Sequence, residues 1–237
     1  MNLHAIHFGE DNLYQRLAKV LAYSAKKNSP NTPIIIHAGP STNQEIIENQ
    51  RRGCFGHDIV NALKTKYHNE IVQNAELGEF ICLMDLDMAV MSDLSEAEGD
   101  YDLGYTVRDQ KARINSGIIF VRVSEKTKQW YSRWHEIVYQ LLNDAGKLSK
   151  LKLIYSGINQ SALGIMLQES HNLVLKEFPA KIWNLTPVHY NSFNSETKVI
   201  HMLNHASALS QPNGTQPGAK VAKAWLALEK ESTSALL

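Results

Sequence analysis

Residues 81–93 read ICLMDLDMAVMSD, an apolar run that an Asp-Leu-Asp triplet interrupts. The apolar residues from Phe80 to Met84 are typical of a short strand buried on both faces of a sheet. Asp85 and Asp87 follow directly, which predicts two carboxylates at the end of that strand. Two such carboxylates can both reach a divalent cation where the chain turns, and Mg²⁺ and Mn²⁺ favour oxygen ligands. Aspartates at strand ends also cap turns, so a purely structural interpretation stays open here.

The first part of the chain alternates between short apolar segments and longer amphipathic ones. Residues 3–8, 33–39 and 80–84 predict three strands. Residues 11–27 and 58–74 predict two helices, because their apolar side chains recur every three or four positions. We expect the second strand to be buried, because PIIIHAG is largely a continuous β-branched run. This alternation indicates a parallel sheet with helices on its faces, where ligands bind beyond the carboxyl ends of the strands.

The remainder of the chain is less regular. Residues 115–123 predict a strand, and residues 126–142 predict a helix with an apolar face. A shorter helix is expected from about Ser156, and one or two short strands are expected within residues 173–187. Residues 198–203, KVIHML, predict a late strand that carries a histidine. We therefore expect an α/β protein with a more mixed second half.

Composition narrows the possible partners. Lys plus Arg and Asp plus Glu each total 24 in 237 residues, and this balance argues against a nucleic acid or an anionic membrane as the main partner. No apolar stretch approaches the ~18 residues of a membrane span and no leader pattern is present, so we expect a soluble, cytoplasmic protein. Cys54 and Cys82 give no disulfide framework or zinc signature, and Cys82 is expected to be a buried thiol. Trp130 and Trp134 share one helical face and are expected in the core.

Residues 80–94, FICLMDLDMAVMSDL, resemble the Asp-x-Asp segment of the GT-A glycosyltransferases, which use nucleotide-sugar donors. The resemblance is to the retaining group that includes glycogenin and the bacterial lipooligosaccharide galactosyltransferases. Four other stretches are similar to segments of that family in the same order. They are AIHFGEDN at 5–12, KTKYHNEIVQNAELGEF at 64–80, INSGIIFVRV at 114–123 and KVIHML at 198–203.

The resemblance implies a fold and an activity. The fold would be GT-A-like, with a mixed, mostly parallel central sheet flanked by helices, in a single domain over residues 1–237. Residues 1–95 would form the nucleotide-binding half, residues 96–210 the sugar and acceptor half, and residues 211–237 a C-terminal helix. The activity would be metal-dependent transfer of a sugar from a nucleotide-diphospho-sugar, with uridine as the implied base. The sugar, the acceptor and the stereochemical outcome stay open.

The resemblance also assigns roles to individual residues. Asp85, Asp87 and His201 would hold Mn²⁺ or Mg²⁺. A basic residue on the helix before the aspartates would reach the donor, which is Lys64 or Lys66, and we assign Lys66. The full set expected to contact the nucleotide is Phe8, Gly9, Lys66, Asp85 and Asp87. The set expected to act on the transferred sugar is Asn115, Asn159 and Gln160.

Each of these assignments has a simpler structural alternative. His201 could be an ordinary core histidine, Asn115 could only begin a strand, and Asn159 could cap a helix. The family has an Asp-Gln pair where this chain has Asn159 and Gln160, and a side-chain amide cannot act as a base or nucleophile at neutral pH. A catalytically inactive protein that binds a nucleotide-sugar or a glycan is therefore the main alternative function.

A phosphatase of the haloacid dehalogenase type also ends a strand in Asp-x-Asp. In that class a threonine follows the aspartates closely, whereas Met88 and Ala89 occupy the place here. No later apolar run ends in an adjacent pair of aspartates. This alternative is the weaker of the two.

Overall fold

The computed structural model describes residues 1–8, 12–39, 56–110, 112–169, 171–202 and 218–235. Its central sheet has six strands in the order β2-β1-β3-β6-β5-β7. Three of the strand pairings are parallel, whereas β6 runs antiparallel to both of its neighbours. The expected mixed, mostly parallel sheet is thereby confirmed. The strands are β1 Asn2–His7, β2 Ile34–Ala38, β3 Phe80–Met84, β5 Leu103–Val107, β6 Ile114–Arg122 and β7 Leu175–Pro179.

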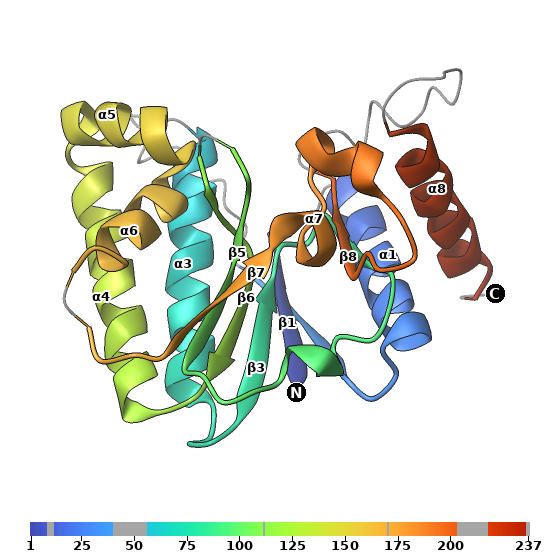
Figure 1. Cartoon of the computed structure of the whole chain (residues 1–237), viewed down its shortest axis with the longest axis horizontal. Helices are drawn as coiled ribbons and strands as arrows, with labels where there is room; N and C mark the ends of the chain where they lie inside the picture. Colours follow the sequence, from blue (N-terminus) through green and yellow to red (C-terminus); the bar gives the residue numbers. More distant parts are fainter. Residues whose placement is uncertain (9–11, 40–55, 111, 170, 203–217, 236–237) are drawn as a thin grey trace.

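Helices cover both faces of this sheet (Figure 1). α3, α4 and α6 lie on one side, while α1, α8 and a small two-stranded sheet of β4 and β8 lie on the other. The helices are α1 Asn12–Asn28, α3 Gly56–Asn74, α4 Glu125–Leu142, α5 Ala145–Tyr155, α6 Ile158–Met166, α7 Ala180–Trp183 and α8 Ala219–Ser234. The remaining elements are β4 Met88–Val90, β8 Val199–His201 and the short 3₁₀ helices η1 Ser95–Ala97 and η2 Pro187–Ser192.

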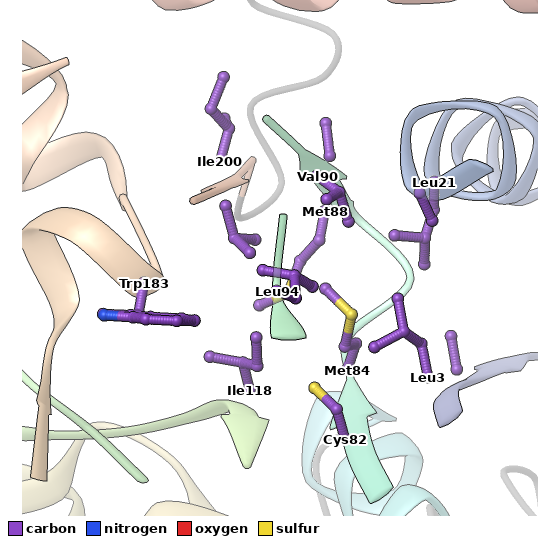
Figure 2. Close-up of a cluster of buried hydrophobic side chains, with 14 of the residues drawn as sticks. Leu3, Leu21, Cys82, Met84, Met88, Val90, Leu94, Ile118, Trp183 and Ile200 are labelled. Carbon is purple, nitrogen blue, oxygen red and sulfur yellow. The ribbon is translucent and has the colours of Figure 1, made fainter. Parts of the chain in front are cut away.

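The central strand β3 explains why its sequence is apolar throughout. Ile81 and Leu83 face the cluster built with α3, α4 and α6, whereas Cys82 and Met84 face the cluster built with α1, α8 and the β4–β8 ribbon. Figure 2 shows the second cluster, with Cys82 and Met84 beside Leu3 and other buried side chains. Both faces of β3 are thus removed from water, and Cys82 is a buried free thiol as expected. Cys54 lies outside the described residues.

The expected alternation of the first part is present, but the prediction for its second strand was wrong. β1 pairs in parallel with both β2 and β3, as the strand–helix pattern indicates. β2 is not buried, because it is an edge strand of the sheet with β1 as its neighbour. Ile34 and Ile36 pack against the core, whereas Ile35 is 44% exposed. A continuous β-branched run therefore does not by itself place a strand in the middle of a sheet.

In the second half, the expected elements around β6, α4, β8 and α8 are present, and Trp130 and Trp134 are buried on α4. The segment expected to hold short strands contains β7 followed by α7. Strands β4 and β5 and helix α5 were missed, as were the short helices α7, η1 and η2. The helix expected near Ser156 is α6, with Gly157 as its N-cap, so Asn159 lies inside the first turn and is not the cap. Among the described helices, none has the length and apolar character needed to cross a bilayer.

Candidate functional site

Three residues that are far apart in the sequence meet at the carboxyl end of β3. Asp85 and Asp87 lie in the turn between β3 and β4, and β4 pairs antiparallel with β8 so that Met88 is opposite His201. The Met202 N–H donates to the carbonyl oxygen of Asp87, which continues this pairing into the turn. His201 Nε2 lies 3.2 Å from Asp87 Oδ1 and 3.5 Å from Asp85 Oδ2. One ligand atom from each residue falls within 4.8 Å of the others, which is close enough for one cation to bind all three.

A buried hydrogen-bond network determines which ring nitrogen of His201 carries a proton. Asn115 Oδ1 accepts from the Gly117 N–H, and Thr106 Oγ1 donates to the Asn115 carbonyl oxygen. Asn115 Oδ1 and Thr106 Oγ1 can therefore only accept a hydrogen bond from Asn184. The atom of Asn184 that lies 2.8 Å from each of them is accordingly the amide nitrogen, Nδ2. The amide oxygen of Asn184 is then the atom that faces His201 Nδ1, also at 2.8 Å. His201 Nδ1 must carry a hydrogen, because an amide oxygen can only accept.

This tautomer leaves His201 Nε2 directed at two carboxylates. In a neutral imidazole with Nδ1 protonated, Nε2 has a lone pair, which Asp85 and Asp87 would repel. A proton or a metal cation between the three groups removes that repulsion. Burial alone would raise the pKa of Asp87, but the charge and hydrogen bond of His201, together with Lys64, outweigh it and lower the pKa of this carboxyl. The arrangement therefore favours cation binding with an ionised Asp87.

The beginning of β6 connects the aspartate turn to the other predicted residues. The Gly117 carbonyl oxygen accepts from the Asp85 N–H at 2.8 Å. A Cβ at Gly117 would come within 2.5 Å of His201 Cε1, so the glycine provides the space in which the ring lies. Asn115 is buried, and its amide oxygen bonds Asn184 and the Gly117 N–H. The Asn-Ser-Gly segment thus contacts two of the candidate metal ligands, Asp85 and His201.

Asn159 and Gln160 lie against the same end of β6. Asn159 is buried and donates from Nδ2 to Ser116 Oγ at 2.7 Å. Gln160 is half-buried and donates from Nε2 to the Ile114 carbonyl oxygen at 3.2 Å. The amide oxygens of both side chains lie beside Gly157, at 3.3 and 2.9 Å from where its Cβ would be. The structure therefore brings Asn115, Asn159 and Gln160 together around one strand end.

The two candidate lysines on α3 point in different directions. Lys64 forms an ion pair with Asp85, with Nζ 2.6 Å from Oδ1, and both side chains are largely shielded from solvent. Lys66, two positions along the helix, lies near α4, where its charge adds to burial in lowering the pKa of His135. Residues two apart on a helix do not share a face. Of the two lysines, Lys64 is the one that contacts the aspartate turn.

The end of β1 is the other predicted contact region. Phe8 is half-buried and packs edge-on against Tyr67 of α3, with ring centroids 5.8 Å apart. A Cβ at Gly39 would come within 2.6 Å of the Phe8 ring, so this glycine allows the close packing of the two chain segments. Gly9 lies outside the described residues. Phe8 therefore lies at the same edge of the sheet as Asp85, because β1 and β3 are parallel neighbours.

Sequence analysis missed Asn184, which is fully buried and contacts three members of the network. Asn184 follows α7 in an irregular stretch, and its neighbours in the sequence give no pattern that would mark it. The hydrogen bond between Ser116 and Asn159 was also missed, because the two residues are far apart in the sequence.

No protein-family model matches the chain, and no curated protein sequence is significantly similar to it. Solved structures do resemble its fold. A galactosyltransferase, LgtC, in complex with donor and acceptor sugar analogs, has a TM-score of 0.58 at 14% identity over 98% of this chain and 96% of its own. A glycosyltransferase involved in glycosylation of the major capsid of PBCV-1 has a TM-score of 0.54 at 14% identity, covering 88% of this chain and 98% of its own.

The glycosyltransferase GlyE of Streptococcus pneumoniae TIGR4 is also similar, with a TM-score of 0.53 at 14% identity. That match covers 96% of this chain and 60% of GlyE. Identities this low carry information on the fold alone. The structural matches, together with the strand order and the β4–β8 ribbon, show that this chain has the GT-A-like fold of the glycosyltransferases.

Proposed function

We propose that this protein is a metal-dependent glycosyltransferase that moves a sugar from a nucleotide-diphospho-sugar to an acceptor. The observation that carries the proposal is the convergence of Asp85, Asp87 and His201, with His201 Nε2 directed at both carboxylates. Two carboxylate oxygens and one imidazole nitrogen suit Mn²⁺ or Mg²⁺, with positions left for phosphate oxygens and water. The resemblance to the retaining GT-A enzymes adds uridine as the base of the donor.

In this proposal each side chain has a separate task. A divalent cation at the three ligands would neutralise charge on the donor diphosphate as it leaves. Lys64 lies beside Asp85 and would add a positive charge on the side of α3. Phe8, with Gly9, would form the nucleotide side, and Lys64 takes the place that the sequence assigned to Lys66. Asn115, Asn159 and Gln160 would orient the transferred sugar from the end of β6.

Asn159 favours one alternative function. Its side chain is an amide at the position where the resembling family has a carboxylate, and an amide cannot act as a nucleophile or base. A protein that binds a nucleotide-sugar without transferring it would have the same fold and the same metal ligands. Such a protein would still bind UDP and a metal but would not release UDP from a UDP-sugar.

Thermal unfolding with UDP, with GDP and without nucleotide, each with and without Mn²⁺, tests the proposed site. A ligand present at ~100 times its dissociation constant should stabilise the native state by about 2.7 kcal/mol. We expect a shift that needs both UDP and Mn²⁺ and is lost in Asp87→Asn. Asp144→Asn is the matched control, because Asp144 caps α5 from an exposed position and asparagine caps equally well. A metal-dependent shift that survives in Asp87→Asn would reject the metal assignment.

Transfer is then tested separately from binding. UDP release from a panel of UDP-sugars, measured with and without candidate acceptors, distinguishes the enzyme from the binding protein. Release that depends on Mn²⁺ and on Asp87 supports the enzyme. Tight metal-dependent UDP binding without any release supports the binding protein.

A further inference from the structure

Three basic side chains that play no part in the metal centre gather beyond the carboxyl end of β5. Arg108 directly follows β5, whose last residue, Val107, pairs with Pro179 at the end of β7. Lys181 is two residues past Pro179, on α7, and His189 lies on η2. The charges of Arg108 and Lys181 both act on His189. Arg108, Lys181 and His189 are called the basic cluster below.

Arg108 lacks the partners that other arginines of the described chain have. Arg113 and Arg133 form ion pairs with glutamates, and Arg122 donates to the Gly99 carbonyl oxygen. Arg108 is half-buried, its Nε is buried without a hydrogen-bond partner, and none of the described residues forms an ion pair with it. Burial lowers the pKa of Arg108, yet a guanidinium stays charged in proteins. A partly desolvated charge without an ion-pair partner is unfavourable, and an anion would relieve that cost.

His189 adds a second unsatisfied group. Its Nδ1 is buried and has no hydrogen-bond partner among the described residues. Burial and the charge of Arg108 lower the pKa of His189, Asp109 opposes this, and Lys181 adds to it. Asp109 is exposed and forms no ion pair with Arg108. The cluster therefore has more positive than negative charge, together with two buried polar atoms that no group in the described part of the chain satisfies.

The basic cluster lies next to the metal centre but is separate from it. Thr106 is on β5, two residues before Arg108 in the sequence. Thr106 bonds Asn184, and Asn184 bonds His201. Asn184 is also three residues after Lys181 in the sequence. The cluster thus borders the centre through β5 and α7, whereas Lys64 is on α3 and contacts Asp85.

We propose that Arg108, with Lys181 and His189, binds an anionic group, a phosphate or a carboxylate, carried by the acceptor. The part of this proposal that concerns the acceptor rests on the proposed glycosyltransferase function. The diphosphate of the donor would already be held through the three metal ligands and Lys64, none of which belongs to the basic cluster. Guanidinium binds phosphate and carboxylate in a two-pronged geometry, which suits a fixed anionic group on an otherwise neutral sugar or lipid acceptor.

The test uses inorganic phosphate as the probe for the anionic group, and the full-length chain at constant ionic strength. Thermal unfolding is followed with increasing phosphate, with and without saturating UDP and Mg²⁺. At about ten times its dissociation constant, phosphate should raise the unfolding midpoint by about 2–5 °C. We expect this shift to persist when UDP and Mg²⁺ are bound, because the two sites differ. We expect Arg108→Gln to abolish the shift.

Arg113→Gln is the matched control, because Arg113 belongs to the same loop but is exposed and already paired with Glu177. General effects of phosphate on stability would appear equally in this variant. Arg108→Lys should bind phosphate at least about tenfold more weakly than the wild type, because lysine cannot make the two-pronged contact. Without phosphate, Arg108→Gln should unfold at the same temperature as the wild type or higher, because it removes an unpaired charge. That result separates lost binding from lost folding.

Two outcomes overturn the proposal. A phosphate shift of equal size in Arg108→Gln shows that the anion binds elsewhere. A shift that disappears on saturation with UDP and Mg²⁺ shows that phosphate occupies the donor site. If UDP and Mg²⁺ alone give no stabilisation, the proposed function fails, and the dependence of the phosphate shift on Arg108 still decides whether the anion site exists.

Discussion

The two halves of the central sheet contribute to the proposed metal centre in different ways. The parallel half, β2-β1-β3, supplies Asp85 and Asp87 through a single turn at the end of β3. The antiparallel half, β6-β5, contributes no ligand from its strands. It supplies Asn115, which bonds Asn184, and Asn184 in turn bonds His201. It also supplies Gly117, whose missing side chain leaves room for the His201 ring. One half therefore provides charge, and the other determines the position and tautomer of the histidine.

This difference shows which part of the proposed metal centre has the more demanding structural requirements. An Asp-x-Asp turn can form in many proteins and needs only its own strand. The histidine needs a strand without a side chain at Gly117, an acceptor at Asn184, and two further groups that orient that acceptor. Changes in the antiparallel half should therefore weaken metal binding even though they alter no ligand.

The largest effect is expected for Gly117→Ala. The added methyl would lie 2.5 Å from His201 Cε1 and 2.8 Å from Nδ1, so the ring must move. Metal–ligand distances tolerate only about 0.2 Å, and loss of a supporting group alone typically costs 10–100-fold. Displacing a ligand should therefore weaken Mn²⁺ binding by at least about 100-fold. The loss of the free Mn²⁺ signal in paramagnetic resonance, titrated in the presence of UDP, measures this.

Gly104→Ala is the control for that experiment. Gly104 is on β5, and its Cβ would lie 2.6 Å from Phe178 Cε2 of β7, so the variant overpacks the same sheet without contacting the histidine. Both variants should unfold at lower temperature, by a comparable amount. If Gly104→Ala weakens Mn²⁺ binding as strongly as Gly117→Ala, the effect comes from general destabilisation and the two halves do not differ in the proposed way.

A smaller effect is expected at Asn184. Asn184→Leu removes the acceptor for His201 Nδ1–H and should weaken Mn²⁺ binding by about 10–100-fold. Asn184→Asp keeps that acceptor and loses the two hydrogen bonds to Thr106 and Asn115, so it should bind Mn²⁺ more tightly than the leucine variant. Thr106→Val removes one partner of Asn184 and leaves the contact with His201 in place. Equal affinities in the leucine and aspartate variants would mean that Asn184 does not act through the histidine.

Sequence analysis located the parallel half well because its signals are local. The apolar run of β3 and the aspartates after it are consecutive, and the apolar side chains of α1 recur with clear helical spacing. The burial of β2 was misjudged, because no local pattern shows that a strand has only one neighbour. The choice between Lys64 and Lys66 likewise depends on which side of α3 faces β3.

The antiparallel half could be predicted only in part. β5, LGYTV, is short and contains a glycine and a threonine, so it lacks the apolar run that marked the other strands. Asn184 bonds residues that are 78, 69 and 17 positions away in the sequence. A role that rests on such distant partners has no signature in the neighbouring residues. The resemblance indicated the Asn-Ser-Gly segment and His201 but not the residue that connects them.

The parallel half also contains a histidine group that should limit stability in acid. His4 Nδ1 and His37 Nε2 are 2.9 Å apart with stacked rings, and His68 is buried nearby on α3. Burial, then the charge of His37, lowers the pKa of His4 to about 4, with Glu79 opposing. Burial also lowers the pKa of His37 and, more strongly, of His68. These pKa values lie below the value of an unfolded histidine. The contribution of the three histidines to the free energy of unfolding is therefore fully present above about pH 6.5 and is lost as the pH falls.

We therefore expect acid to destabilise the parallel half through protonation of this group. For His4 alone, going from pH 6.5 to pH 5 should cost about 2 kcal/mol of unfolding free energy. His4→Asn should be less stable than the wild type at pH 7, because it loses packing and the contact with His37. The difference in free energy of unfolding between the two proteins should be smaller at pH 5, because only the wild type loses the contribution of His4. Urea unfolding at the two pH values measures this, with His171→Asn, an exposed histidine, as control. A gap that stays constant would show that His4 does not contribute to the loss of stability in acid.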